Sequence, residues 1–113
     1  MVFEEILEAI WSNQGVEGVV FLDSEGEAIS SFGFQDQETL RLLGAYQGIV
    51  LAAAGRLGLS ADRTVITLGG QRSILTQHLK DGYFISVIFS SDVNFAYARF
   101  RFQDAYALLK QEL

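Results

Sequence analysis

The sequence of 113 residues contains neither cysteine nor proline, and it has a single histidine. Without cysteine, the chain cannot form a disulfide framework, a thiolate metal site or a cysteine nucleophile. A zinc site needs several nitrogen or sulfur ligands, more than one histidine provides. Without proline, the chain has no proline-rich linker. We therefore expect no catalytic residue, no cofactor and no metal, and we interpret His78 as a surface or hydrogen-bonded residue.

Basic residues are also scarce. Eight lysines and arginines stand against 14 acidic residues, which gives a net charge of −6 and an isoelectric point near 4.6. The basic residues are scattered and form no stripe, so we expect no nucleic-acid partner. An acidic surface instead favours a protein partner that carries a basic patch. The glycine-containing segments match neither a P-loop nor a dinucleotide fingerprint, so the chain is not expected to bind nucleotide itself.

Long apolar runs are absent as well. The longest covers residues 49–54, whereas a membrane-spanning helix needs roughly 18. The first residues are acidic where a secretory signal is basic. We therefore expect a soluble, cytoplasmic protein without membrane insertion. Because the sequence shows no repeat, charge block or low-complexity segment, we expect a single domain over residues 1–113.

What is present is a large apolar fraction, with 50% hydrophobic residues and nine phenylalanines. Helical and strand periodicities predict an α/β (α+β) domain with the order α-β-β-α-β-β-β-α. Its sheet is expected to be five-stranded and mainly antiparallel, with helices on both faces. Strands 16–23 and 83–89 are apolar on both faces and are expected to pair at the centre, with the more polar strands nearer an edge. The expected strands are 16–23, 28–32, 63–68, 72–79 and 83–89, and the helices begin near residues 3, 36 and 90. Asp36 and Ser90-Ser91-Asp92 are the expected caps of the second and third helices, and Asp81-Gly82 is the expected turn of the last hairpin.

The predicted helices are too few to cover both faces of this sheet. Five strands about 4.8 Å apart make a sheet roughly 20–25 Å wide, and one helix covers about 10 Å. The first and last helices together cover one face, and the central helix alone is expected to leave part of the other face open. The apolar residues of that helix also spread over an arc of about 200°, which is more than one buried face needs.

The central helix carries glycines on its remaining side, although each costs about 1 kcal/mol relative to alanine inside a helix. One explanation is that the glycines let the helix lie close to its own sheet. The other is that two copies of the helix meet there, while an edge strand pairs with its symmetry mate. On the second interpretation, Gly48→Leu weakens dimers and leaves monomer secondary structure mostly intact. The predicted dimer interface is Gly44, Gly48, Ala52, Gly55, Thr64, Val65, Ile66 and Thr67.

The segment 15–23, with the sequence GVEGVVFLD, is followed by Ser24-Glu25-Gly26 and Ala28-Ile29-Ser30. This hydrophobic strand, acidic-glycine turn and second strand resemble the opening hairpin of the roadblock (dynein light chain roadblock) family. The element order extends the resemblance over the whole chain, although profilin-like and longin folds share much of this architecture. The resemblance implies a homodimer with packed central helices and a continuous sheet, and a small Ras-like GTPase as partner.

Three functions stay open at this point. The first is a non-enzymatic, homodimeric regulator or GTPase-activating partner of a small GTPase, with Arg41, Tyr46 and Arg56 as the first contacts to test. The second is a structural scaffold subunit that joins a larger complex through the same surface. The third is a profilin-like ligand-sensing domain, which requires an apolar cavity between sheet and helix.

Overall fold

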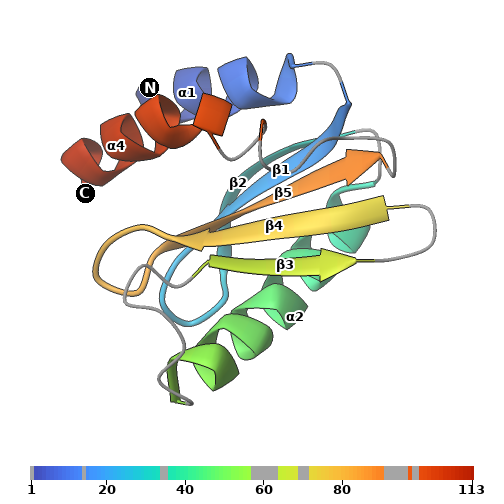
Figure 1. The fold of residues 1–113 in the computed structure, drawn as a ribbon, viewed down its shortest axis with the longest axis vertical. Coiled ribbons are helices and arrows are strands. Elements are labelled where there is room, and N and C mark those ends of the chain that lie inside the picture. Colours follow the sequence, from blue (N-terminus) through green and yellow to red (C-terminus); the bar gives the residue numbers. More distant parts are fainter. Residues whose placement is uncertain are drawn as a thin grey trace.

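A computed structural model of the chain shows one sheet with helices on both faces (Figure 1). The structure describes residues 2–13, 15–33, 36–56, 64–68, 72–90, 97 and 100–113. The predicted α/β class is confirmed. The described elements are α1 (Val2–Trp11), β1 (Val16–Leu22), β2 (Ala28–Gly33), α2 (Gln37–Arg56), β3 (Thr64–Leu68), β4 (Arg72–His78), β5 (Phe84–Ser90) and α4 (Gln103–Glu112).

The strands lie in the order β2-β1-β5-β4-β3, and every neighbouring pair is antiparallel. The two strands that are apolar on both faces, β1 and β5, pair with each other as predicted. Strand β3 is an edge strand, but β4 lies inside the sheet between β5 and β3. Strand β4 is thus one strand from the edge, and the expectation that the more polar strands lie nearer an edge than the central β5 is confirmed. Ser73, Thr76 and Gln77 of β4 are buried, and the side chains of Thr76 and Gln77 form hydrogen bonds inside the protein.

Two turns follow the predicted turn chemistry. In the β1–β2 connection, one carboxylate oxygen of Asp23 accepts hydrogen bonds from the backbone N–H groups of Glu25 and Glu27 at 2.9 and 3.0 Å. In the β4–β5 connection, Asp81 and Gly82 both have positive φ, 55° and 85°. A tight hairpin turn of this handedness requires positive φ at its two central residues, which aspartate and glycine tolerate.

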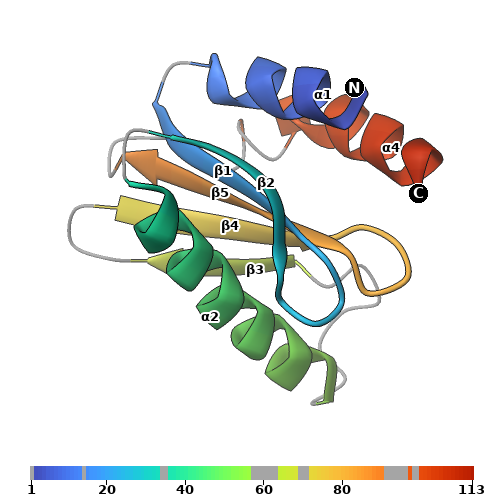
Figure 2. The ribbon, with the colours of Figure 1, turned by 180° about the vertical axis from the view of Figure 1, so that it is seen from behind.

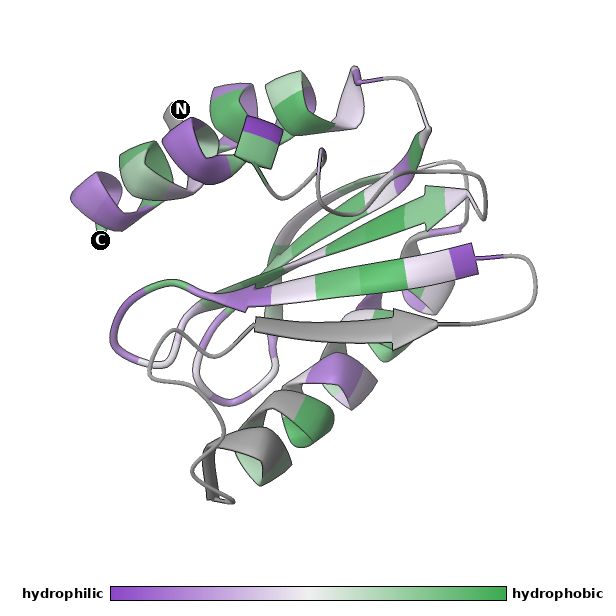
Figure 3. Cartoon of the chain, in the orientation of Figure 1, coloured by the Kyte–Doolittle hydropathy of each residue, from purple (hydrophilic) through white to green (hydrophobic). Residues whose placement is uncertain are grey.

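Helices α1 and α4 cover one face of the sheet (Figure 1). Stacked aromatic rings link both helices to the sheet. The ring centroid of Phe3 in α1 lies 5.1 Å from that of Phe21, and the ring centroid of Phe102, just before α4, lies 6.1 Å from that of Phe89. Apolar residues of β1, β4 and β5 are concentrated in the middle of the sheet, beneath these helices (Figure 3). The core on this side also includes Leu7, Ile10, Val19, Leu75, Ile85, Val87, Tyr106 and Leu109.

Helix α2 crosses the opposite face of the sheet (Figure 2). Leu40 of α2 packs there on apolar residues of the sheet, and the exposed fractions of the whole cluster lie between 0 and 9%: Leu40, Val20, Leu22, Ile74, Phe84 and Ile88. The expectation that the central helix leaves part of this face open is therefore wrong for the described strands β1, β4 and β5. The side chains of β3 lie outside the description. The uncovered apolar surface is found on α2 itself.

The first turn of α2 is fixed by Asp36, the predicted N-cap. Its carboxylate accepts hydrogen bonds from the backbone N–H and the hydroxyl of Thr39 at 2.9 and 2.8 Å. Side-chain acceptors of this kind satisfy the free N–H groups of a helix start. The predicted cap of the last helix at residues 90–92 lies largely outside the described residues, and no described helix is long and apolar enough to cross a bilayer.

Candidate interaction surface on helix α2

Three large apolar side chains are exposed on the outer face of α2. Leu42, Tyr46 and Ile49 have exposed fractions of 65, 62 and 66%. Their spacing of i, i+4 and i+7 puts them in one row along the helix, here called the α2 stripe. Isolated apolar residues at a surface are common, but a continuous row of this kind is typical of an interaction site. These residues belong to the wide apolar arc seen in the sequence, but only Tyr46 was predicted as a site residue.

The glycines of α2 point the other way. A Cβ on Gly44 would lie 2.9 Å from Cδ2 of Leu22, and a Cβ on Gly48 would lie 2.7 Å from Cζ of Phe84. Both distances are shorter than real Cβ contacts, so these positions have no room for a side chain. Gly44 and Gly48 let the helix lie close to its own sheet, which supports the first of the two explanations. Their place in a dimer interface stays a prediction. This close approach also helps one helix to seal the face beneath it.

A buried polar group fixes α2 on the sheet. The Thr76 hydroxyl donates to Oε1 of Gln47 at 3.3 Å and shares a hydrogen bond of 2.9 Å with the hydroxyl of Ser86. All three side chains are almost fully buried. Because a buried polar group without a partner is costly, this arrangement favours one rotation of α2 about its axis. That rotation turns the α2 stripe outward.

The other predicted interface residues have different positions. Ala52 is exposed, and Arg41 is exposed beside Leu42. Gly55 and Arg56 belong to α2, but their side chains lie outside the description. Thr64, Val65, Ile66 and Thr67 belong to β3, which pairs with β4 on one side and has no described strand on the other. Strand β3 thus lies at an edge of the described sheet and in contact with α2 (Figure 1).

Among the described residues beside α2, neither a ligand cavity nor a catalytic group is apparent. The hollow formed by Ala45, Gly48, Phe84 and the β1–β2 turn has a volume of about 190 Å³, below the roughly 300–1,000 Å³ of typical ligand pockets. The His78 ring accepts a hydrogen bond from the Gly82 N–H at 3.3 Å, in agreement with its interpretation as a hydrogen-bonded residue. The described part of the chain contains no cluster of three metal-ligating side chains.

No protein-family model matches the sequence, and a search of curated proteins also finds no match. Solved structures match closely. MglB of Myxococcus xanthus has a TM-score of 0.84 at 18% identity, over 98% of this chain and 94% of that one. A Roadblock/LC7 domain from Streptomyces avermitilis has a TM-score of 0.80 at 13% identity, over 96% and 94%. The gliding protein MglB from Thermus thermophilus has a TM-score of 0.75 at 16% identity, over 96% and 86%.

These similarities define the class of fold. The chain has the roadblock fold, and the resemblance seen in its opening hairpin is confirmed at this level. Among the three structures, MglB of Myxococcus xanthus has the highest TM-score with this chain.

Proposed function

We propose that this domain is a non-enzymatic, homodimeric interaction module that regulates a small Ras-like GTPase. The observation that carries the proposal is the α2 stripe, three large apolar side chains exposed in one row. The GTPase as partner rests on the resemblance to the roadblock family, within which bacterial members regulate polarity or gliding GTPases. The structure of the same fold from Thermus thermophilus is that of a gliding protein.

The α2 stripe fits a second copy of itself. Two stripes related by a twofold axis form an isologous contact in which the same residues meet from both sides. Each large apolar side chain that becomes buried contributes about 1–2 kcal/mol, since about a third of it is already covered. The central part of the row is Tyr46, and aromatic residues are enriched among the strongest contributors to protein interfaces. The interface therefore rests on Leu42, Tyr46 and Ile49 in place of the glycines.

The open edge of β3 supplies the second part of the proposed interface. An edge strand presents unpaired backbone N–H and C=O groups that pair readily with another strand. Antiparallel pairing of two β3 strands would join the two sheets into one. Because α2 and β3 are in contact within one copy, we expect one twofold axis to serve both the helix contact and the strand pairing.

The GTPase is then bound outside the dimer contact. Arg41 is exposed at the border of the α2 stripe, and it is the first residue that we would test for this role. Arginine anchors many protein interfaces because its planar group donates several hydrogen bonds. Arg56 remains a predicted contact with the GTPase, whereas we now assign Tyr46 to the contact between the two copies.

Pull-down with a small Ras-like GTPase in its GTP and GDP states tests the partner directly. We expect binding that differs between the two states and is weakened by Arg41→Ala. Binding without a nucleotide preference and without a change in GTP turnover would instead identify a structural scaffold subunit. No binding in either state would contradict the regulatory proposal while leaving the homodimer untouched.

A further inference from the structure

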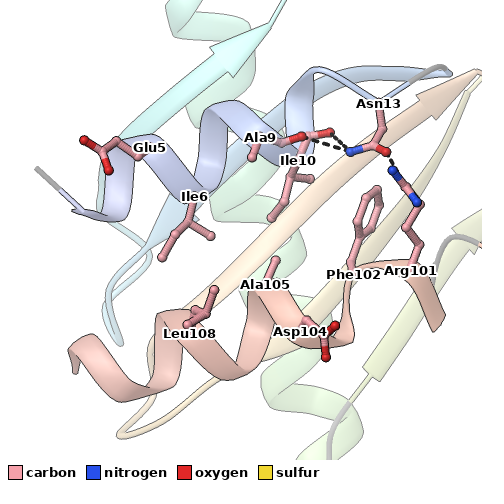
Figure 4. Close-up of a pocket in the computed structure, with 10 residues that line it drawn as sticks. All are labelled: Glu5, Ile6, Ala9, Ile10, Asn13, Arg101, Phe102, Asp104, Ala105 and Leu108. Atoms are coloured by element: carbon pink, nitrogen blue, oxygen red, sulfur yellow. Dashed lines mark hydrogen bonds between the residues drawn. The ribbon is translucent and has the colours of Figure 1, made fainter.

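A second apolar surface lies on the other side of the sheet, between α1 and α4. The two helices form an open groove of about 470 Å³, here called the α1–α4 groove (Figure 4). Its floor is made by the buried side chains of Ile6, Ile10 and Phe102. Ala9 and Ala105 line it with small side chains, and Leu108 is half exposed at one end. The groove is therefore apolar along its floor and open to solvent along its length.

One end of the groove is held by a set of hydrogen bonds. The Nε–H of Arg101 donates to Oδ1 of Asn13 at 2.6 Å. The Asn13 amide in turn donates to the carbonyl oxygens of Ala9 and Ile10 at 2.9 and 3.2 Å. These bonds tie the C-terminal end of α1 to Arg101, in the segment that precedes α4. This end of the groove is therefore preformed.

The walls of the groove are acidic. Glu5 on α1 and Asp104 on α4 are exposed and lie on opposite walls (Figure 4). All charged residues of α1 are acidic: Glu4, Glu5 and Glu8. Arg101 keeps its positive charge at the Asn13 end, and against this one cation the lining holds two carboxylates, Glu5 and Asp104, so the groove is acidic on balance. A partner with positive charge on both sides of an apolar row complements this pattern.

We propose that the α1–α4 groove binds a basic amphipathic helix of a partner protein. From Glu5 to Asn13 the α1 wall rises about 12 Å, which matches about two turns of a third helix. The alanines allow that helix to approach to about 8–10 Å from α1 and α4. Its apolar residues at i, i+4 and i+7 would cover the floor, and lysines or arginines on its two flanks would meet Glu5 and Asp104.

The charges favour this occupant over two others. A second copy of the chain carries the same net charge of −6, so charge does not favour a contact between copies at this groove. An anionic lipid surface would be repelled by the same carboxylates. The inference goes beyond the proposed function, since it concerns a second binding surface. The sheet separates this groove from the α2 stripe, so the domain could hold both surfaces occupied at once.

The probe is a synthetic, fluorescently labelled helix of about four turns, built on alanine, with leucines at i, i+4 and i+7 and lysines along both flanks. Its control carries glutamate at every lysine position. Amide chemical shifts of the full chain, recorded during titration, locate the bound peptide. We expect the lysine peptide to shift Ala9, Ala105 and Leu108, and we expect the glutamate peptide to leave them unchanged.

Variants separate specific binding from a general attraction to an acidic protein. Ala105→Arg fills the groove with a charged side chain and should weaken binding at least about tenfold. Glu5→Gln with Asp104→Asn should weaken it about threefold to tenfold at low salt. The matched control, Glu25→Gln with Glu27→Gln, removes the same charge from the exposed β1–β2 turn and should have a much smaller effect. Circular dichroism confirms that each variant is folded.

Three results would overturn the proposal. Shifts confined to Leu42, Tyr46 and Ile49 would show that the peptide prefers the α2 stripe. Equal binding of both peptides, or equal loss in the two charge variants, would remove the role of Glu5 and Asp104. A smaller molecular mass of Ala105→Arg than of the unchanged chain would show that the groove is a contact between copies. The first and third results would also bear on the proposed dimer, but none of the three bears on GTPase binding.

Discussion

Gly48 lies where α2 comes closest to strand β5. A Cβ at this position would lie 2.7 Å from the Phe84 ring, which is 3% exposed and has little freedom to move. A glycine inside a helix costs about 1 kcal/mol relative to alanine, and here that cost is offset by a closer fit of helix and sheet. At the residue scale, the absence of a side chain at Gly48 allows the close packing of helix and sheet within one copy.

Gly48→Leu should therefore destabilise the monomer by at least about 2 kcal/mol, because a side chain is forced into a packed core. This replaces the sequence-based expectation that the substitution mainly weakens dimers. Urea denaturation measures the change. Ala52→Leu is the matched control, since Ala52 is exposed on the same helix. Unchanged stability of Gly48→Leu would contradict the close packing of α2 on Phe84.

Thr76→Val should cost about 1–3 kcal/mol, because the lost hydroxyl bonds to both Gln47 and Ser86 in a buried setting. The free energy of unfolding of Thr76→Val, Ser86→Ala and the double variant gives the coupling. We expect the double variant to lose less than the sum of the single variants, since the two hydroxyls share one hydrogen bond. Simple additivity would show that the pair does not act together.

At the scale of elements, the start of α2 depends on the ionised side chain of Asp36. Hydrogen bonds from the backbone N–H and the hydroxyl of Thr39 lower the pKa of this carboxyl from its ordinary value of 3.8. A lowered folded-state pKa means that the charged cap stabilises the fold above that ordinary value. The contribution is lost as the pH falls through the lowered pKa of the folded state.

Asp36→Ala should therefore be less stable than the unchanged chain at neutral pH, and the difference should shrink once the pH falls below about 4. Asp36→Asn keeps a capping acceptor without the charge, so it should lose less stability and show less dependence on pH. Thermal unfolding across this pH range measures both. A stability difference that stays constant into acid would contradict the role of the charged cap.

Much of the fold could be predicted from the sequence because its signals are local. The doubly apolar β1 and β5, the Asp23 turn and the Asp36 cap each depend on neighbouring residues and on periodicity. The direction in which the α2 glycines face could not be predicted, because the sequence pattern is the same whether a glycine faces its own sheet or a second helix. The side chain that Gly48 contacts, Phe84, is distant in sequence. The partners of the buried Thr76, which lie on α2 and β5, could not be predicted for the same reason, because they are also distant in sequence.

The candidate site was predicted only in part. The wide apolar arc of α2 correctly indicated more apolar surface than one buried face requires. It did not tell which residues stay exposed, because that depends on the rotation of the helix set by Gln47, Gly44 and Gly48. The α1–α4 groove had no signal at all in the sequence. It results from the pairing of two helices about 90 residues apart, with alanines facing each other.

At the scale of the whole molecule, α2 seals the face of β1, β4 and β5 beneath it within one copy, while Leu42, Tyr46 and Ile49 remain exposed on its outer face. We therefore expect a partner to cover the helix. In the proposed homodimer, the α2 stripe and the β3 edge meet their symmetry mates on one side. The α1–α4 groove stays free on the opposite face of each sheet for another protein.

Substitutions in the α2 stripe should separate the dimer from the fold. Tyr46→Ala should weaken the dimer by about 2 kcal/mol, roughly 30-fold, because a central aromatic contact is lost. Since Tyr46 is 62% exposed in one copy, the stability of the monomer should change little. Dilution experiments measure the dissociation constant. Glu25→Gln, in the exposed turn between β1 and β2, is a control that should leave it unchanged.

The most direct test is the mass of the chain in solution, measured by sedimentation at micromolar concentration for the unchanged protein and for Ile49→Lys. One copy has a mass of 12.5 kDa. We expect twice that mass for the unchanged chain and a folded monomer for Ile49→Lys, which places a charge inside the proposed contact. A monomeric unchanged chain, or a dimer that Ile49→Lys leaves intact, would contradict the claim that a second copy covers α2.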